Sequence, residues 1–526
     1  MPVIINNISC GLDQDKNDVI GKALRSVGLK NARRAEIYKT SLDARKRAEI
    51  HFVYSVYLEL DDDEQERLLC ERFASASYAE KCSVKVVKGS EKPDGRICIA
   101  GFGPAGMFCA LLLAENGYKP IVFEKGSDVD SRVKAVDLFW KGGELDTESN
   151  VQFGEGGAGT FSDGKLTTRI KDPLCRYVLE QFVRFGAPED ILTKAKPHIG
   201  TDKLRGVVKK LRERVVELGG EVRFERPVTD FVSSNKRITS VICKDGAEKC
   251  SALVLAAGHS ARETFELLAK KGVFLEPKPF AVGVRIEHKQ KDVDESLYGK
   301  LAGDPRLPVG EYQLTSRDRC GRAVYTFCMC PGGTVVPAAS EKNTVVTNGM
   351  SEFARDGKNA NAAVVAAVSP KDYGGAVLDG VDFARQIEQR AYNLTGSYKA
   401  PATAVRGLLN GKPDLDSDID PTFACGVTAA DIGKLFPEYI TNALKDGLKD
   451  FSRKMKCFGD GSALLTAPET RTSSPVRITR NERFNSLSYD NLFPCGEGAG
   501  YAGGIMSAAV DGIKVALEIM SRQAAE

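Results

Sequence analysis

Three glycines and one acidic residue, all within residues 96–125, could together bind a phosphate-bearing nucleotide. Gly101, Gly103 and Gly106 have the spacing GxGxxG, and Glu124 follows Gly106 after 18 positions. In such a motif the first glycine permits a tight turn, the second lets the backbone approach a pyrophosphate, and the third allows close packing of helix and strand. A carboxylate about 20 residues further on accepts hydrogen bonds from ribose hydroxyls. The pattern therefore predicts that the chain binds an adenine dinucleotide.

The elements that must position this motif are also visible in the sequence. Residues 97–100 form a short apolar run, which is typical of a buried parallel strand, and residues 107–113 have an apolar helical pattern. Asn116 and Gly117 end that helix, and a second apolar run, residues 120–123, leads directly into Glu124. Strand, glycine turn, helix and strand in this order favour a nucleotide-binding βαβ unit over an ordinary glycine-rich turn. The phosphates would lie at the helix N-terminus, where free N–H groups and the helix dipole favour anions.

Two further glycine-rich segments differ in the structure predicted after each of them. Residues 154–159 read GEGGAG and match GxGxxG, but residues 160–164 include threonine, serine, aspartate and glycine, which disfavour a helix. We therefore predict a glycine-rich loop there and not a second fingerprint. Near the C-terminus, residues 491–494 resemble a strand, residues 496–500 read GEGAG, and a helix is predicted from residue 505 to 520.

Composition and charge restrict the functional classes. The 526 residues carry a net charge of +3, with 28% charged and 42% hydrophobic residues, as in a globular protein of two or three domains. The charge is too small to suggest a nucleic-acid or membrane partner. The fourteen cysteines include no CxxC pair, and the four histidines lack ligand spacing. With no signal-peptide pattern in the first ten residues, we expect a cytoplasmic protein with reduced thiols and no metal site.

Changes in composition along the chain predict three domains. An alternating apolar pattern at residues 49–60 indicates a strand in a small N-terminal α+β unit of ferredoxin-like type, whose last strand we expect at residues 83–87. Strand-like and turn-like segments dominate after about residue 275, with a helix expected near residues 361–368. The predicted domains are residues 1–90, residues 91–274 together with 481–526, and residues 275–480.

Several longer phrases carry a resemblance to a known family. They are NVQFGEGGAGTFSDGKL, KPFAVGVRIEH, CMCPGGTVVPAASE, ETRTSSPVRI and PCGEGAGYAGGIMSAAVDG. They resemble a bacterial family known as uncharacterised FAD-dependent dehydrogenases. More distantly, the chain resembles one-Rossmann flavoproteins such as geranylgeranyl reductases and p-hydroxybenzoate hydroxylase. The resemblance, from about residue 35 onward, implies FAD and an α/β fold. In that fold a Rossmann-like FAD-binding domain contains an inserted, mostly-β substrate domain and comes after the N-terminal unit.

The resemblance also implies which residues contact FAD. Glu124 would bind the adenosine ribose, the backbone of Val228 the adenine, and Glu497 would replace the aspartate that usually binds the ribityl chain. The start of the last helix would place N–H groups at the flavin N1/O2 edge, although helix capping alone is the alternative for Gly503 and Gly504. The full implied set is Gly101, Gly103, Pro104, Ala105, Gly106, Glu124, Gly157, Gly159, Thr160, Val228, Ala257, Gly258, Gly496, Glu497, Gly503, Gly504 and Ile505.

The catalytic residues remain open, with five polar side chains as candidates. They are Thr160, Lys165, His259, Arg285 and Arg471. The loop of residues 156–165 is the candidate for the flavin N5 face. His259 could donate a proton, but a histidine hydrogen-bonded beside the Ala257–Gly258 turn is favoured. The two arginines could bind an anionic substrate, although salt bridges within their own domain are favoured for each.

One further motif has two interpretations. Cys328 and Cys330 form a C-x-C sequence that could be redox-active. Structural thiols are the favoured interpretation.

The leading functional hypothesis is an FAD-dependent oxidoreductase that transfers hydride between a small-molecule substrate and flavin N5. A second fingerprint for a resident nicotinamide is missing from the sequence, so NAD(P)H would visit transiently, or another carrier would supply electrons. The alternative hypothesis is a non-enzymatic flavoprotein, a redox sensor or partner-binding module that works through the N-terminal domain. An NAD-dependent dehydrogenase is disfavoured because it leaves residues 496–512 unexplained.

Overall fold

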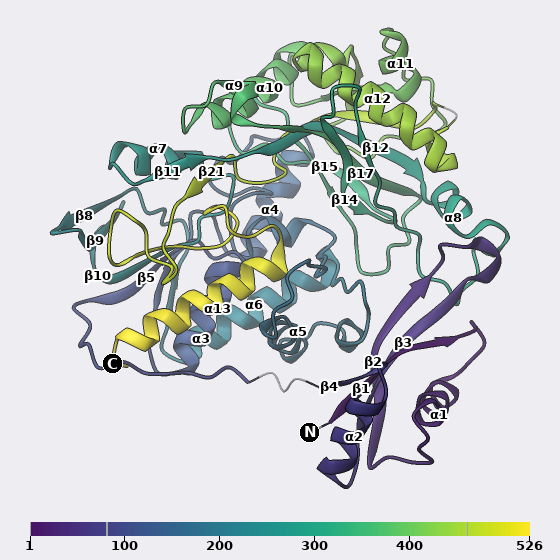
Figure 1. Ribbon diagram of the computed structural model, residues 1–526. Helices are drawn as coiled ribbons and strands as arrows, with labels where there is room; N and C mark the ends of the chain where they lie inside the picture. The colour runs from purple at the N-terminus through teal and green to yellow at the C-terminus, as the bar shows by residue number, and fades with distance from the viewer. Residues whose placement is uncertain (1, 80–82, 460, 526) are drawn as a thin grey trace.

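The computed structural model describes residues 2–79, 83–459 and 461–525, and its first sheet belongs to a small N-terminal unit (Figure 1). The strands have the order β2-β3-β1-β4, and every neighbouring pair is antiparallel. With one helix after β1 and one after β3, this is the βαββαβ arrangement of a ferredoxin-like fold. The elements are β1 (Val3–Cys10), α1 (Lys16–Ser26), β2 (Arg34–Asp43), β3 (His51–Glu59), α2 (Asp63–Arg72) and β4 (Ala76–Tyr78). The strand expected at residues 83–87 is wrong, because β4 already completes the sheet.

The second sheet carries the glycine fingerprint. Its parallel strands have the order β7-β6-β5-β10-β22, and the first half of β10 also pairs with an antiparallel meander of β9 and β8. The strand order reverses between β5 and β10, and ligands of open α/β sheets bind beyond the carboxyl ends of strands at such a point. The strands are β5 (Arg96–Ala100), β6 (Ile121–Phe123), β7 (Glu221–Arg223), β8 (Asp230–Ser234), β9 (Arg237–Cys243), β10 (Gly246–Leu255) and β22 (Leu492–Pro494).

One face of this sheet is covered by helices that come from distant parts of the chain. Figure 1 shows the C-terminal helix α13 lying alongside α3, with α5 and α6 next to them. Helix α3 is buried over its whole circumference from Ala105 to Ala114, because it lies between the sheet and α13. Gly512 permits this approach, since a Cβ there would lie 2.1 Å from the Ala105 carbonyl oxygen. The helices are α3 (Pro104–Glu115), α4 (Val129–Trp140), α5 (Leu174–Arg184), α6 (Thr201–Glu217), α7 (Arg262–Lys270) and α13 (Ile505–Arg522).

The third sheet has seven strands in the order β13-β14-β17-β12-β20-β18-β19, and only β18 and β19 pair in parallel. Helices α10 and α12 cover it in Figure 1 and close its hydrophobic core. The helix expected near residues 361–368 is wrong, because that segment belongs to β17, a central strand that pairs with β12 and β14. The elements are β12 (Phe280–Lys289), β13 (Thr315–Arg317), β14 (Ala323–Cys330), β17 (Asn359–Val368), α10 (Asp379–Thr395), β18 (Ala400–Ala404), β19 (Val427–Ala429), α12 (Glu438–Lys454) and β20 (Leu464–Glu469).

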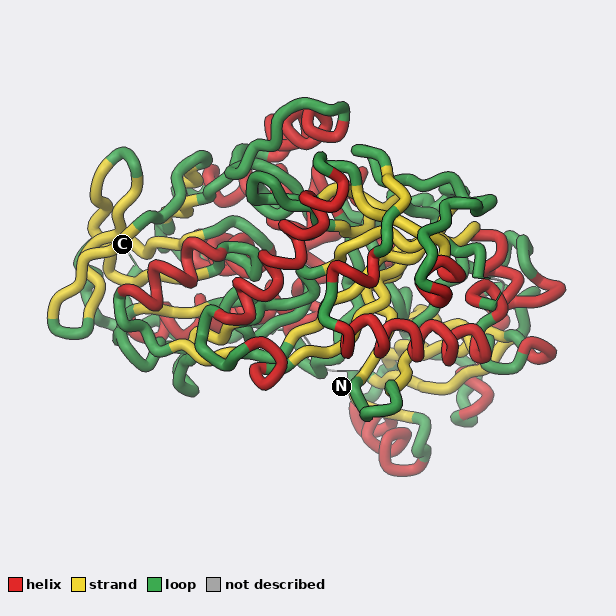
Figure 2. The backbone as a smooth tube through the Cα atoms, turned by 90° about the horizontal axis from the view of Figure 1, so that it is seen from above, coloured by secondary structure: helices red, strands yellow, loops and turns green. Residues whose placement is uncertain are grey.

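The chain passes from the second sheet to the third and back through two paired strands, β11 (Leu275–Pro277) and β21 (Val476–Ile478). Short elements flank the third sheet, and Figure 2 shows from above how helices surround the strand-rich parts. These elements are α8 (Gln290–Tyr298), β15 (Thr334–Pro337), β16 (Thr347–Met350), α9 (Pro370–Tyr373) and α11 (Val405–Asn410). The α/β fold class, with its Rossmann-like sheet, its mostly-β part and its ferredoxin-like unit, is confirmed. The domain boundaries stay a prediction.

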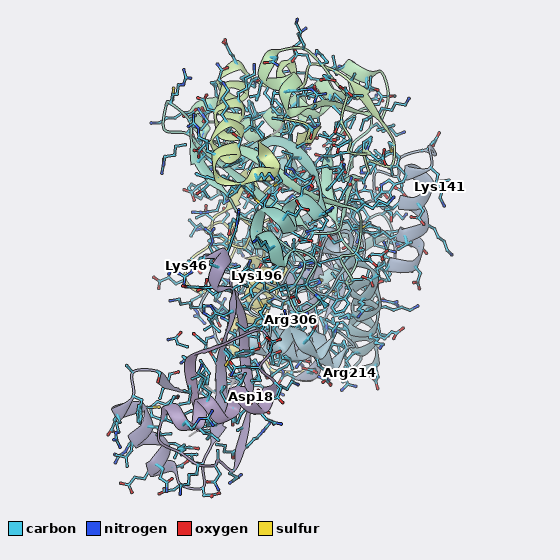
Figure 3. The ribbon with its side chains drawn as sticks, turned by 90° about the vertical axis from the view of Figure 1, so that its right-hand side faces the viewer. Asp18, Lys46, Lys141, Lys196, Arg214 and Arg306 are labelled. Carbon is cyan, nitrogen blue, oxygen red and sulfur yellow. The ribbon has the colours of Figure 1, made fainter. Side chains whose placement is uncertain are left out.

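The N-terminal unit projects from the rest of the molecule (Figure 3), and an ion pair of Asp13 with Arg306 is one of its contacts with that part. Its strand β2 forms two backbone hydrogen bonds with the segment after α5: Thr40 N–H to Thr193 O at 2.7 Å and Ala195 N–H to Thr40 O at 2.9 Å. Arg47 Nη2 donates to the Ser296 carbonyl at 2.5 Å. Among the described residues, no helix combines the length and apolar character that crossing a bilayer requires.

Candidate functional site

The fingerprint glycines perform two different tasks in the structure. Gly101 comes after β5 with φ +101°, and a Cβ there would lie 2.4 Å from the Ala256 carbonyl oxygen. A Cβ on Gly106 would lie 2.0 Å from the Gly101 carbonyl oxygen, so both positions are filled by backbone. Gly103, the N-cap of α3, is different, because a Cβ there meets only the Gly157 Cα at 3.7 Å. The space at the α3 N-terminus suits a pyrophosphate bound by backbone N–H groups.

The glycine-rich loop lies directly opposite this helix N-terminus. A Cβ on Gly157 would lie 3.1 Å from the Gly103 Cα, and a Cβ on Gly159 would touch Ile505 of α13 at 3.1 Å. A single 3-10 turn spans Gly157–Phe161, and the backbone is extended at Ser162. Three segments that are far apart in sequence, the fingerprint, this loop and the start of α13, therefore meet at one edge of the parallel sheet.

Arg132 of α4 holds the glycine-rich loop in place, and sequence reasoning missed it. Its side chain is fully buried and donates to four backbone carbonyls, within 2.7 to 3.0 Å. The acceptors are Asn150, Val151, Glu155 and Gly157. Burial lowers the pKa of the guanidinium to about 9. Nothing in the sequence around Arg132 signals this role, because all four acceptors are backbone atoms that any sequence could supply.

Glu124 lies where the sequence predicts it, and its carboxylate is already engaged. Oε1 accepts hydrogen bonds from the N–H groups of Gly126 and Gly154, and Oε2 accepts from Phe102 at 2.7 Å. Since Oε2 has one such bond, it retains a lone pair for a ribose hydroxyl. The carboxylate therefore connects the fingerprint to the glycine-rich loop. The segment that leads to Val228 runs beside it, because Arg226 N–H donates to the Glu124 carbonyl at 2.9 Å.

The Ala257–Gly258 turn that follows β10 contacts the late glycine motif. Gly258 has φ +80°, and a Cβ on Gly498 would lie 2.4 Å from the Gly258 carbonyl oxygen. The late motif is held to α13, since Gly496 N–H donates to Asp511 Oδ2 at 2.7 Å. The late motif also meets the fingerprint, since a Cβ on Gly496 would lie 2.8 Å from the Ala105 Cβ.

The start of α13 is capped by side chains of its own loop. Gly504 N–H donates to Glu497 Oε2 at 3.2 Å, and Gly503 N–H donates to Ser507 Oγ at 3.0 Å. A Cβ on either glycine would meet no atom within 4 Å. Burial raises the pKa of the Glu497 carboxyl to about 7. The extra methylene of Glu497, compared with aspartate, lets the carboxylate reach back to the helix N-terminus. A flavin edge placed there would replace these side-chain acceptors.

The two candidate arginines form ion pairs. Arg285 of β12 is fully buried, with Nη1 3.0 Å from Glu469 Oε1, and it also donates to Asn361. Arg471 binds both carboxylate oxygens of Glu388, at 2.9 and 3.1 Å. The favoured salt-bridge interpretation therefore describes both side chains.

Two buried donors near the Ala257–Gly258 turn remain without a partner among the described residues. They are Arg471 Nη1 and Gln152 Nε2. Gln152 lies next to the turn, because its Oε1 accepts a hydrogen bond from Ser260 Oγ at 3.0 Å. Arg471 lies near the turn, because, in addition to burial, its positive charge lowers the pKa of His259. Buried donors are nearly always paired with protein or ordered water, so these two atoms are available to donate to an acceptor on a ligand. Sequence reasoning missed Gln152.

The other three candidates differ in their chemistry. Thr160 is buried, and its hydroxyl donates to the Glu155 carbonyl, which is a structural role. Lys165 Nζ lies 3.1 Å from Asp163 and 3.3 Å from Glu311, and although burial lowers the pKa of Lys165, these carboxylates raise it overall. Burial, together with nearby arginines, lowers the pKa of His259 to about 4, so the imidazole is neutral at pH 7.

These observations fit FAD. The open Gly103 position and the capped start of α13 offer N–H groups to a pyrophosphate and to a flavin edge, respectively. Glu124 retains a lone pair for a ribose, and the two orphaned donors beside His259 are available to donate to acceptors on a ligand. Among the described residues, no cluster of histidine, cysteine or carboxylate side chains could hold a metal ion.

Similarity to solved structures is weak. The chain is 12% identical to glycine oxidase from Bacillus cereus, covering 82% of this chain and 98% of that one, with a TM-score of 0.35. It is also 12% identical to L-proline dehydrogenase from P. horikoshii, covering 82% and 94%, with a TM-score of 0.34. Scores this low carry no argument about function.

Similarity in sequence is stronger. Residues 279–472 match the family model described as "FAD-dependent protein, C-terminal domain-like". A protein of Clostridium beijerinckii, described as "Uncharacterized protein", is 44% identical over 531 residues, which cover 99% of each chain. The Rossmann-like sheet and the matched domain agree on the cofactor, which is FAD. The chain belongs to the same family as the Clostridium beijerinckii protein, and it contains a domain of FAD-dependent proteins.

Proposed function

We propose that this protein is an oxidoreductase in which a small-molecule substrate exchanges a hydride with N5 of the bound flavin. The observation that carries the proposal is the convergence of the fingerprint, the glycine-rich loop and the start of α13 at one edge of the parallel sheet. FAD, when bound, supplies the two-electron chemistry, and the protein binds and orients the reactants.

The chain's own residues would tune this chemistry in three ways. The N-terminus of α13 stabilises negative charge on whatever lies against Gly503 and Gly504. Glu497, whose pKa is raised to about 7, can hold or release a proton at its carboxyl oxygen near neutral pH. His259 stays neutral and serves as a hydrogen-bonding group beside Arg471.

The partners are proposals that rest on the same residues. The substrate would be a small molecule, and an anionic one would suit the spare N–H of Arg471. The electrons would come from or pass to a transient NAD(P)H or another carrier. We propose a cytoplasmic location, with neither a nucleic acid nor a membrane as a partner.

The experiment begins with the cofactor. Purified protein is expected to be yellow, or to take up added FAD after the cofactor is removed, and to be bleached by anaerobic photoreduction. A screen of oxidants and reductants with the reduced and oxidised protein would then identify the substrate. A colourless protein that binds no added FAD contradicts the proposal.

A second candidate function, a flavoprotein redox sensor, is favoured by a chain of contacts. The segment that pairs with β2 of the N-terminal unit leads into Lys196, whose Nζ lies 2.7 Å from Glu311. Glu311 also binds Lys165, in the loop next to the proposed flavin site. This chain of contacts could connect the flavin to the N-terminal unit. Turnover of a small molecule by the holoenzyme would favour the enzyme over the sensor.

A further inference from the structure

We propose that Cys328 and Cys330 form a redox-active pair that cycles between two thiols and a disulfide and exchanges two electrons with bound FAD. This inference rests on the proposed function for the presence of FAD, but it needs no knowledge of the substrate. Both residues belong to β14, and Cys330 is the last residue of that strand.

The backbone at this point departs from that of a regular strand. The pairing of β14 with β17 shifts between Phe327 and Cys330, and Cys328 has φ +43°. A bulge of this kind bends a strand and re-aims a side chain. Residues two apart in a regular strand are about 6.7 Å apart, at the upper end of the Cα distance that a disulfide accepts. Cys330 Sγ lies against the backbone of Cys328, because its thiol donates to the Cys328 carbonyl at 3.4 Å.

Two cationic side chains act on the pair, and each of them is itself paired with a carboxylate. Arg285, which pairs with Glu469, donates through Nη2 to the Cys328 carbonyl at 2.6 Å and to Cys330 Sγ at 3.6 Å. The charges of Arg285 and Lys165 favour a negative sulfur at Cys328, whereas burial and the charge of Asp163 oppose it. The mutual interaction of the two thiols lowers the pKa of Cys328 and raises that of Cys330. Cys328 is therefore the member that ionises more readily, which is the asymmetry that thiol–disulfide chemistry uses.

The pair also borders the proposed flavin end of the site. Cys330 is buried, but Cys328 is only half-buried. The charge of Lys165, in the glycine-rich loop, acts on Cys328. A charge on Cys328 in turn acts on Glu497, which accepts a hydrogen bond from Gly504 at the start of α13. Cys328 is thus within electrostatic range of both segments that would hold the flavin ring.

The proposed step balances without a further reactant. The Cys328 thiolate and the Cys330 thiol lose two electrons and one proton as the S–S bond forms and the S–H bond of Cys330 breaks. The oxidised flavin gains those two electrons and that proton and becomes the singly negative reduced form. The negative charge moves from sulfur to the flavin, where the α13 N-terminus stabilises it. The reverse step reduces the disulfide.

A second pair of neighbouring thiols, Cys98 and Cys250, has a purely structural environment and can be compared with Cys328 and Cys330. Cys98 and Cys250 lie on neighbouring strands β5 and β10, and their side chains also interact. Both are buried in the core, and no cation comparable to Arg285 donates to either sulfur in the part of the chain that the structure describes. The interaction with Cys250 and burial raise the pKa of Cys98 far above its ordinary value. This pair is expected to stay reduced and serves as the internal control.

The test is an anaerobic reductive titration of the holoenzyme after mild oxidation and removal of the oxidant. The wild-type protein is expected to take up four electrons per FAD, two for the flavin and two for the disulfide. Cys328→Ser and Cys330→Ser should each take up two, and Cys320→Ser, which changes an exposed thiol, should still take up four. Uptake of two electrons by the oxidised wild type overturns the inference.

A second measurement does not depend on the variants retaining FAD. Oxidised wild-type protein is denatured, alkylated and digested, and the peptide that contains both cysteines is weighed before and after reduction. A Cys328–Cys330 crosslink that disappears as the flavin is reduced supports the inference, and alkylation of both thiols in the oxidised protein contradicts it. Failure to bind FAD at all would instead overturn the proposed function, so the two failures are distinguishable.

Discussion

At the scale of single residues, the site depends on buried charged side chains. Some, such as Glu388, have all their hydrogen-bonding atoms paired, whereas Arg471 has one nitrogen without a partner among the described residues. Glu388 is fully buried and binds Arg262 and Arg471, each through two contacts, and it also accepts from Thr470. Burial opposes ionisation, but the two guanidinium groups lower the pKa of Glu388 to about 2. This carboxylate therefore holds in place the two arginines whose charges act on His259.

Replacing that carboxylate should be costly. Glu388→Gln leaves two buried guanidinium groups without their common counter-charge, and we expect a loss of about 3–5 kcal/mol in the free energy of unfolding. Urea unfolding of the purified variant measures it. Glu341→Gln, which changes a more exposed partner of Arg262, is the matched control and should cost about 1 kcal/mol or less. Equal losses in both variants would contradict this account.

The lowered pKa of His259 predicts a dependence of stability on pH. An unfolded chain protonates this histidine below about pH 6.5, whereas burial and the charges of Arg471, Arg262 and Lys278 keep it neutral in the folded protein down to about pH 4. The unfolded state binds more protons in this window. The contribution of His259 is therefore fully present above pH 6.5 and is lost as the pH falls toward 4.

We expect His259→Gln to remove this part of the pH dependence, which amounts to about 3 kcal/mol at most. Unfolding free energies of wild type and variant at pH 7 and pH 5 measure it, with and without bound FAD. His51→Gln, in β3 of the N-terminal unit, removes a histidine that lies away from these cations and is the control. An unchanged slope in the His259 variant would mean that the imidazole is already charged in the folded state.

At the scale of elements, the glycines of the β5–α3 turn have two different roles. Gly101 and Gly106 pack against backbone atoms, whereas Gly103 leaves space for a ligand. Gly106→Ala would force a methyl group to 2.0 Å from a backbone oxygen, and we expect a lower free energy of unfolding by several kcal/mol. Gly103→Ala is expected to fold normally, since its methyl group meets only an ordinary contact, but to weaken FAD binding about tenfold or more by filling the pyrophosphate position. Thermal unfolding and FAD titration of both variants test this contrast.

Gly206→Ala in α6 is the control for both substitutions. A Cβ there meets no atom within 4 Å, so a gain of about 0.5–1 kcal/mol in stability with unchanged FAD affinity is expected. Normal FAD affinity in Gly103→Ala would mean that the phosphates bind elsewhere.

The elements also show where local patterns mislead. Residues 359–368, NANAAVVAAV, contain mostly alanine and valine, and a short apolar run of this kind does not distinguish a strand from a buried helix. The segment is a strand because β12 and β14 supply hydrogen bonds along both of its edges. In contrast, the pattern of α3 was decisive, because the glycine turn before it and Asn116 and Gly117 after it mark both of its ends.

At the scale of the whole molecule, the ferredoxin-like unit is an appendage with its own core, but the segment after it belongs to the rest of the protein. Gly89 N–H donates to the Met520 carbonyl, and Glu91 N–H to Arg522, so the segment pairs with the end of α13. Val84 and Val86 pack against the core beneath α3. A cut between the two parts must therefore lie before Val84.

A fragment of residues 83–526 is expected to fold and to take up FAD as well as the full chain does, because the contacts of α13 are retained. A fragment of residues 93–526 loses the pairing with Met520 and Arg522, and we expect a lower midpoint of thermal unfolding. FAD titration and calorimetry of the two fragments compare them. Loss of FAD binding in the longer fragment would show that the N-terminal unit takes part in the site.

The sequence by itself determined the features that arise within short stretches of chain. The fingerprint, the acid after it, the loop character of residues 154–164 and the glycine motif before the last helix each depend on turn chemistry and periodicity over about 30 residues or fewer. Arg132, Gln152 and the ion pairs of Arg285 and Arg471 were decided only by the tertiary structure. Their partners are backbone carbonyls or side chains as many as 184 positions away, and no local pattern encodes them. The same holds for Cys328, whose C-x-C motif is visible in the sequence, whereas its bulge, the cations that act on it and its electrostatic effect on Glu497 exist only once the sheets pack together.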